Sequence, residues 1–329
     1  MEALAQDLRA EICALLAQGP ADLRGLDLVR ADLSGLDLSG CDLRGQDLSQ
    51  ATLRGARLIK AQLQDAVFFE ADLQEAELLG ADLSGADLHQ CSAARAGFGQ
   101  ANLREADLSG GDFSNASFSG ADLEQATMSG AELKGARMVE TRLAHADCSR
   151  VDFEGADLSR SEVRDARFRE ADMRRVRFTG VRGYEEADWI LVDIRQADWR
   201  GAALMWRHIL DENYLWEFKH RSDSHHATYM IWKLTSDCGR RPLLWGLWTA
   251  FIAVVFAGIY EGLAIDYGAH EAPLSSLYFS IVTLTTLGFG DVLPADGWAQ
   301  AAVLAEVVLG YVMLGGLLSI FANKMARRA

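Results

Sequence analysis

Large apolar residues recur at every fifth position over the first part of this chain of 329 residues. The column runs from Leu23 to Phe178, with Leu, Phe, Met, Val or Cys at every step except Ala93. Two positions earlier runs a second column of small residues, of which Ala51 and Ala61 are typical. A period of five fits neither the helical repeat of 3.6 residues nor the strand repeat of two, so the chain must turn at regular intervals. The pattern predicts a solenoid that buries one large and one small side chain per pentad.

The repeat unit, Ala-(Asp/Asn)-Leu followed by two variable residues, resembles the pentapeptide-repeat family. The resemblance implies a right-handed quadrilateral β-helix with four pentads per coil. Thirty-two consecutive pentads from Ala21 to Gly180 keep the register, which slips by one residue between Arg182 and Glu185. After the slip the column resumes at Trp189, Ile194, Trp199 and Leu204. We therefore expect about nine coils over residues 21–206, stacked about 4.8 Å apart.

Residues 1–20 predict a helix that covers the first coil. Leu4, Leu8, Ile12 and either Leu15 or Leu16 fall on one helical face, and Gly19–Pro20 ends the segment. Solenoids need their open ends covered. A capping helix is therefore the expected role.

Charge separates the chain into two parts. Residues 1–206 hold 23 basic and 36 acidic residues, whereas the remainder holds 9 and 11, within a total net charge of -15. Some pentapeptide-repeat proteins inhibit gyrase by imitating DNA with an acidic surface, and that function is one alternative. The Asp column belongs to the repeat itself, however, because a short polar side chain there can bond to the turn backbone. We therefore expect no nucleic-acid partner.

Two long apolar segments follow the repeats. Leu243–Tyr260 carries no charge and Ala299–Asn323 carries only Glu306, and both are long enough to span a bilayer. The segment 207–242 between repeats and spans predicts an amphipathic helical linker along the membrane surface, and 243–329 predicts a membrane domain.

Between the two spans lies TLTTLGFGD, residues 283–291. Two glycines around a phenylalanine free the backbone to turn successive carbonyls to one side. The stretch resembles the potassium-channel signature, in which such carbonyls replace the hydration shell of the ion. The resemblance implies an ion-binding selectivity filter at Thr286, Leu287, Gly288, Phe289 and Gly290. It also implies a homotetramer, since four such loops surround one pore, with potassium ions as the permeant ligand and no cofactor.

The resemblance assigns supporting roles to residues around this filter. Ser275 or Ser276 is expected to cap a re-entrant pore helix of about ten residues, too short to cross the bilayer. Thr285 and Asp291 would support the filter and its outer mouth, and Gly310 stands where the family carries a gating hinge. Glu306 within the second span needs a partner or is protonated, and Tyr278 or the back of the pore helix is the expected partner.

Basic residues set the expected orientation. Lys233, Arg240 and Arg241 precede the first span and Lys324, Arg327 and Arg328 follow the second, so both termini are expected in the cytoplasm of a bacterium, with the spans in its inner membrane.

No constellation of nucleophile, base and metal indicates an enzyme. Leu287 and Phe289 depart from the usual Val and Tyr. A less selective cation channel and a membrane-anchored acidic scaffold therefore remain the alternatives to a potassium channel.

Overall fold

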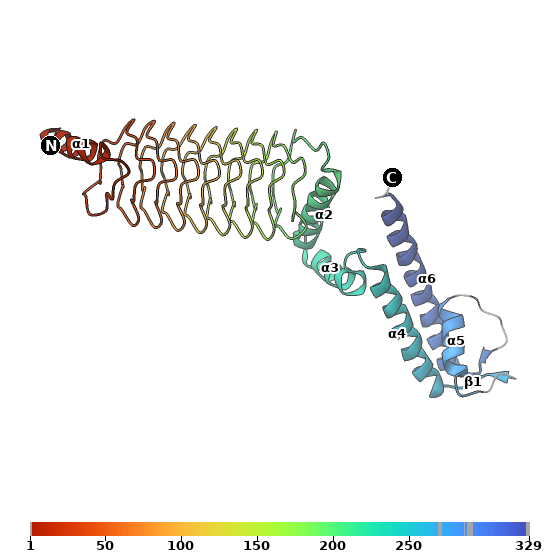
Figure 1. Cartoon of the computed structure of the whole chain (residues 1–329). Coiled ribbons are helices and arrows are strands. Elements are labelled where there is room, and N and C mark those ends of the chain that lie inside the picture. The colour runs from red at the N-terminus through yellow and green to blue at the C-terminus, as the bar shows by residue number, and fades with distance from the viewer. Residues whose placement is uncertain (1, 269–271, 286, 288–291, 327–329) are drawn as a thin grey trace. The chain divides into compact units, whose positions relative to one another are not determined.

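The computed structural model describes residues 2–268, 272–285, 287 and 292–326, with the side chains of 2–7 and 323–326 left aside. The chain forms two compact units, Met1–Trp216 and Glu217–Ala329. The first holds the repeats and the second holds the apolar helices, and each is described below by itself (Figure 1).

The repeats form a four-sided parallel β-helix. Bridges join residues 20 positions apart, as in Asp22↔Asp42 and Thr127↔Asp147, so one coil contains four pentads. The spacing is still 20 at Glu162↔Arg182 and becomes 21 at Arg167↔Asp188, which places one extra residue in that coil. The predicted fold and its one-residue slip are both confirmed.

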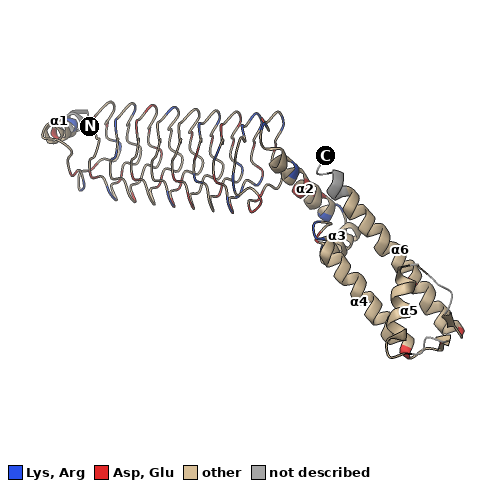
Figure 2. Cartoon of the chain, turned by 45° about the vertical axis from the view of Figure 1, so that its right-hand side comes forward, with Lys and Arg blue, Asp and Glu red and all other residues tan. Residues whose placement is uncertain are grey.

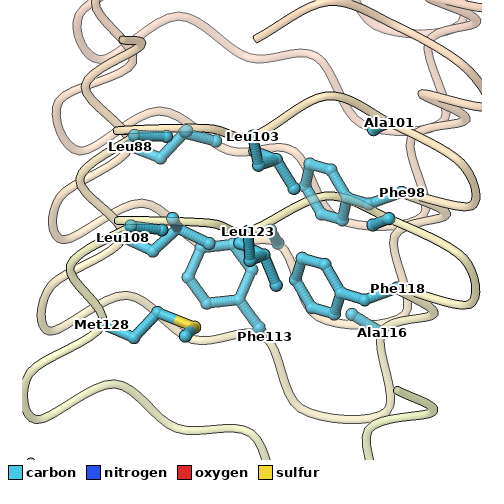
Figure 3. Close-up of a cluster of buried hydrophobic side chains, with 14 of the residues drawn as sticks. Leu88, Phe98, Ala101, Leu103, Leu108, Phe113, Ala116, Phe118, Leu123 and Met128 are labelled. Carbon is cyan, nitrogen blue, oxygen red and sulfur yellow. The ribbon is translucent and has the colours of Figure 1, made fainter. Parts of the chain in front are cut away.

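The two apolar columns fill the interior of the coils. Their leucine, phenylalanine and alanine side chains are buried, and Figure 3 shows those of neighbouring coils lying one above the other. Phe98 and Phe118, one coil apart, stack with ring centroids 4.9 Å apart. Each fifth residue turns a corner with positive φ, for example Gln50 at 58° and Lys60 at 55°.

The Asp column bonds to the turns, as expected. The carboxylate of Asp47 accepts a hydrogen bond from the backbone N–H of Ser49 at 2.9 Å, and the contact recurs between Asp107 and Ser109 at 2.9 Å. The short side chain thereby satisfies a donor that the corner leaves unpaired. These aspartates are thus explained by the architecture of the coil.

Helix α1 (Glu2–Leu16) covers the first coil. Ile12 is fully buried, and Leu8 and Leu16 pack against the same core. Leu15 is exposed, so Leu16 takes the inward position. Leu4 lies outside the residues whose side chains are described.

Helix α2 (Ala203–His220) covers the last coil. Met205 and Ile209 are buried in the core of the β-helix, whereas Leu204 is 69% exposed. The expectation that Leu204 continues the inward column is therefore wrong, because the chain has already become helical at Ala203. The boundary between the compact units falls after Trp216, within a segment whose sequence indicates a linker.

The second unit is helical apart from one short pair of strands. Its elements are α3 (Asp223–Ser236), α4 (Pro242–Glu261), β1 (Ile265–Asp266), α5 (Ser275–Leu284), β2 (Leu293–Pro294) and α6 (Gly297–Ala326). Strands β1 and β2 pair antiparallel, Ile265 opposite Pro294. The indole of Trp248 in α4 donates to the carbonyl of Leu234 in α3 at 3.1 Å.

Composition distinguishes the helices of the second unit from the coils. Figure 2 shows red and blue alternating along the β-helix, whereas α4, α5 and α6 are almost wholly tan. Two of these helices, over Pro242–Glu261 and Gly297–Ala322, are long and apolar enough to cross a membrane. Only 17% of the first span and 22% of the second are buried within the single chain, as expected of helices that face lipid or other subunits.

Candidate functional site

Helix α5 is a short apolar helix packed against both α4 and α6 (Figure 1). Its ten residues rise about 15 Å, half of the roughly 30 Å of a bilayer's hydrocarbon core. Phe279, Ser280, Val282 and Leu284 are buried among the neighbouring helices. An apolar helix of this length can enter the membrane but cannot cross it.

The start of α5 differs from the expected cap. Leu274 occupies the N-cap position and makes no side-chain capping bond, while Ser275 is the first helical residue. The Ser275 hydroxyl instead accepts a bond from the backbone N–H of Ala272 at 2.8 Å, and Ser276 Oγ lies 3.5 Å from Glu261. Neither serine is the N-cap, because the chain turns into the helix one residue earlier than the sequence suggests.

The carboxyl end of α5 leads directly into the predicted filter. Thr285 follows the helix, and its hydroxyl donates to the carbonyl of Ile281 at 2.6 Å. The backbone N–H of Leu287 donates to the carbonyl of Val282 at 3.1 Å, and the Leu287 side chain is exposed. Of the other filter residues, Thr286, Gly288, Phe289 and Gly290 lie outside the described residues, as does Asp291. The end of a helix that reaches this segment carries the negative half of the helix dipole, which favours cations.

Glu306 lies fully buried where α4, α5 and α6 meet. The hydroxyl of Tyr260 in α4 donates to Glu306 Oε2 at 2.5 Å, and Ser280 in α5 contacts Glu306 Oε1. Tyr278, the side-chain partner expected from sequence, is 41% exposed. The carboxyl group bonds the back of α5, as expected, but through Ser280.

Gly310 lies directly against the last residue of α5. A Cβ atom placed on Gly310 would overlap the carbonyl oxygen of Leu284. Gly316 has a similar relation to α4, where the added atom would overlap the indole ring of Trp245. That indole also donates to the carbonyl of Met313 at 2.8 Å. Both glycines therefore allow close approach between helices, and a hinge at Gly310 stays a prediction.

An apolar pocket of about 510 Å³ lies between α4 and α5, and Leu317 of α6 also lines it. Trp245, Thr249 and Ala253 line it from α4, and Ile281 and Leu284 line it from α5. It adjoins the carboxyl end of the re-entrant helix. Its walls offer almost no polar surface, which makes it unsuited to an ion.

Comparison with known families matches both units. An ion-channel family matches residues 244–327, and the pentapeptide-repeat family matches eight copies between residues 21 and 182. The chain joins a pentapeptide-repeat β-helix to an ion-channel domain. Neither matched family is a family of enzymes.

Relatives of the ion-channel domain are potassium channels. The domain is 38% identical over 55 residues to two pore potassium channel b of Oryza sativa subsp. japonica, covering 17% of this chain and 16% of that one. It is 29% identical over 79 residues to TWiK family of potassium channels protein 18 of Caenorhabditis elegans, covering 24% and 15%. The chain thus spans less than a fifth of either relative.

Solved structures resemble the pentapeptide-repeat β-helix. HetL, from the cyanobacterium Nostoc, is 24% identical with a TM-score of 0.28, covering 57% of this chain and 98% of that one. QnrB1, a plasmid-mediated fluoroquinolone resistance protein, is 21% identical with a TM-score of 0.31, covering 57% and 94%. These likenesses concern the fold alone.

Sequence reasoning missed Tyr260 and Ser280. Each is a polar residue within a predominantly apolar helix, and such a residue needs a hydrogen-bond partner inside a membrane. Their positions relative to Glu306 depend on how three helices are rotated against one another. The sequence therefore shows that these polar residues need partners, but it does not show that Glu306 is the partner of both.

Proposed function

We propose that this chain is one subunit of a homotetrameric, potassium-selective channel of a bacterial inner membrane. The observation that carries the proposal is α5, a ten-residue apolar helix that packs against two helices of spanning length and is followed, after Thr285, by the sequence TLGFGD. Residues 286–290 would line the conduction path with backbone carbonyls. A single copy cannot enclose an ion, so the function requires assembly.

The arrangement of the second unit supports this proposal. Irregular backbone is tolerated at membrane depth only where protein or a water-filled cavity surrounds it. Helices α4 and α6 pack against α5, and the contacts of Glu306 and Gly310 fix it from behind. In the proposed assembly, three other subunits would complete the surroundings of the segment that follows α5.

Charge around the spans supports an orientation with both termini in the cytoplasm. Lys233, Arg240 and Arg241 precede α4, while no Lys or Arg occurs from residue 242 to residue 323. Basic residues concentrate on the cytoplasmic side of bacterial spans. The β-helix would then be cytoplasmic, where it can assist assembly or regulate opening. The acidic residues Asp266 and Asp296 would face the outside and attract cations.

Flux measured on the purified full chain in liposomes tests the proposal. We expect the wild-type protein to pass potassium in preference to sodium and to migrate as a tetramer. A Gly288→Val variant should assemble but lose the flux, because a β-branched residue resists the dihedral angles that the filter is expected to need. Gly258→Ala is the matched control, since a methyl group at that position in α4 meets open space.

The other outcomes separate the alternatives. Equal flux of sodium and potassium would identify a less selective cation channel. A folded protein that passes no ions, or a Gly288→Val variant as active as the wild type, would overturn the proposed conduction path and favour a membrane-anchored scaffold.

A further inference from the structure

One buried carboxyl group joins the three helices of the ion-channel domain. Glu306 of α6 receives a hydrogen bond from Tyr260 of α4 at its Oε2 atom, at 2.5 Å. Its Oε1 atom contacts the hydroxyl of Ser280 on α5. Both Glu306 and Ser280 have no solvent-exposed surface, and Tyr260 is 1% exposed. This carboxyl group therefore connects all three helices without contact with solvent.

Counting hydrogens determines which atoms donate. Ser280 Oγ also lies 2.9 Å from the backbone carbonyl oxygen of Ala253 on α4. A serine hydroxyl has one hydrogen, and a carbonyl oxygen can only accept. If Ser280 donates to Ala253, the contact with Glu306 needs a hydrogen that comes from Glu306 itself.

A neutral carboxylic acid satisfies every atom of this set. Tyr260 donates to Oε2, the protonated Oε1 donates to Ser280, and Ser280 donates to Ala253. Each hydrogen then has one acceptor. The three hydrogen bonds run in one direction, from α4 to α6, from α6 to α5, and from α5 back to α4. An ionised carboxylate would instead compete with Ala253 for the single hydrogen of Ser280.

The charges around the site agree with a neutral group. Tyr260 of α4 is the titratable side chain that faces Glu306 directly, and Ser280 faces it from α5. Among the described residues, Tyr267 packs against Phe279 of α5 and Glu261 lies 3.5 Å from Ser276, and both are acids that offer no positive charge. The sequence holds no Lys or Arg between residues 242 and 323. A buried carboxylate without a cation is costly, and more so within a membrane.

We propose that Glu306 is held as a neutral carboxylic acid and is the positioning residue that fixes α5 between α4 and α6. Its importance for conduction rests on the proposed function, because α5 ends at the predicted filter. Its protonation and its role in packing do not rest on that function and are measured separately.

Glutamine is the substitution that tests the idea. In a Glu306→Gln variant the amide oxygen accepts from Tyr260 and the amide nitrogen donates to Ser280, which reproduces the pattern of the neutral acid. Glu306→Ala leaves the hydroxyls of Tyr260 and Ser280 buried without this partner. Glu306→Asp has the same chemistry but is one methylene group too short to reach both.

The experiment compares these variants in the full chain, purified and reconstituted at neutral pH. Infrared spectra of the wild type should contain the C=O stretching band of a protonated carboxyl group, and the Glu306→Gln spectrum should lack it. Glu261→Gln, which removes an exposed carboxylate at the end of α4, should leave that band unchanged. Thermal unfolding of Glu306→Gln should match that of the wild type, whereas the midpoint of Glu306→Ala should fall by about 5 °C or more.

Two results would overturn the proposal. One is a wild-type spectrum with no protonated-carboxyl band that depends on Glu306. The other is a Glu306→Gln variant that unfolds as early as Glu306→Ala, since rescue by the amide is what a neutral acid requires. Neither readout depends on ion flux, so a protein that fails to conduct would overturn the proposed function and leave this assignment standing.

Discussion

At the scale of single residues, two glycines of α6 are explained by packing. Gly310 meets the backbone of Leu284, and Gly316 meets the ring of Trp245, so both mark points where a side chain would separate two helices. Small residues have this role in many membrane helices, because close backbone approach replaces the missing hydrophobic driving force. Bending at Gly310 is a separate property that this contact neither requires nor prevents.

A Gly310→Ala substitution should destabilise the ion-channel domain. The added methyl group overlaps the carbonyl of Leu284, and overpacking of this kind costs about 1–3 kcal/mol. Because the methyl group would meet backbone atoms that cannot turn aside, we expect a cost in the upper part of this range, which exceeds the gain of about 1 kcal/mol from the higher helix propensity of alanine. Thermal unfolding of the purified assembly measures the difference. Gly315→Ala is the control, because Gly315 lies on the same helix but faces open space, and its unfolding temperature should not fall. Equal stability of the two variants would show that α5 yields to the methyl group.

The sequence predicts the residues of the β-helix core far better than those around Glu306. The period of five assigns an inward position to each Leu and Ala because every coil repeats the same geometry. The partner of Glu306 depends instead on the rotation of α5. Ser280 lies two residues beyond Tyr278, about 200° around the helix, and so faces the opposite side. No periodic pattern in ten residues fixes that rotation.

At the scale of elements, α2 is the main departure from expectation. The sequence predicts that the repeats end at residue 206 and that 207–242 is an amphipathic linker. Helix α2 instead begins at Ala203, and its residues Met205 and Ile209 are buried against the last coil and close it. Asn213 completes this closure. Its side chain accepts from the N–H of Leu191 at 2.7 Å and donates to the carbonyl of Trp189 at 2.8 Å. The reasoning that predicts α1 as a cap, that solenoid ends must be covered, applies equally to this end.

Asn213→Ala should therefore loosen the last coil. The substitution leaves the backbone groups of Trp189 and Leu191 without their partner, at a cost of about 1–3 kcal/mol in the free energy of unfolding. Hydrogen exchange at the amide of Leu191 should accelerate, while amides near the middle of the β-helix keep their protection. Leu210→Ala, an exposed position on the same helix, is the control. Unchanged exchange at Leu191 would show that packing of Met205 and Ile209 alone closes the coil.

At the scale of the whole molecule, the two units differ in how they tolerate changes in chain length. The β-helix depends on residues that meet 20 positions apart, so its core should survive the loss of a complete coil. The ion-channel domain has no repeat and depends on single contacts such as those of Glu306 and Trp245. The family matches follow the same division.

Deletion of residues 103–122 should leave a folded protein. This change removes one complete coil, so Asn102 would be followed by Leu123, which keeps both columns inward and both capping helices in place. Deletion of residues 103–120 removes two fewer residues but turns the columns outward, and should prevent folding. Circular dichroism and thermal unfolding of the two variants measure the difference. Two variants of equal stability would contradict the dependence on complete pentads.

The one-residue insertion between Arg182 and Asp188 shows how the β-helix tolerates errors of length. It is absorbed at a corner, and the coil beyond it stacks normally. Because each pentad makes a quarter of a circuit, adding or removing a single pentad would keep every leucine inside yet move the starting point of α2 to the adjacent side of the square. The number of pentads thus determines the side of the β-helix from which the chain leaves, and each added or removed pentad rotates that exit by about 90° while the core stays the same.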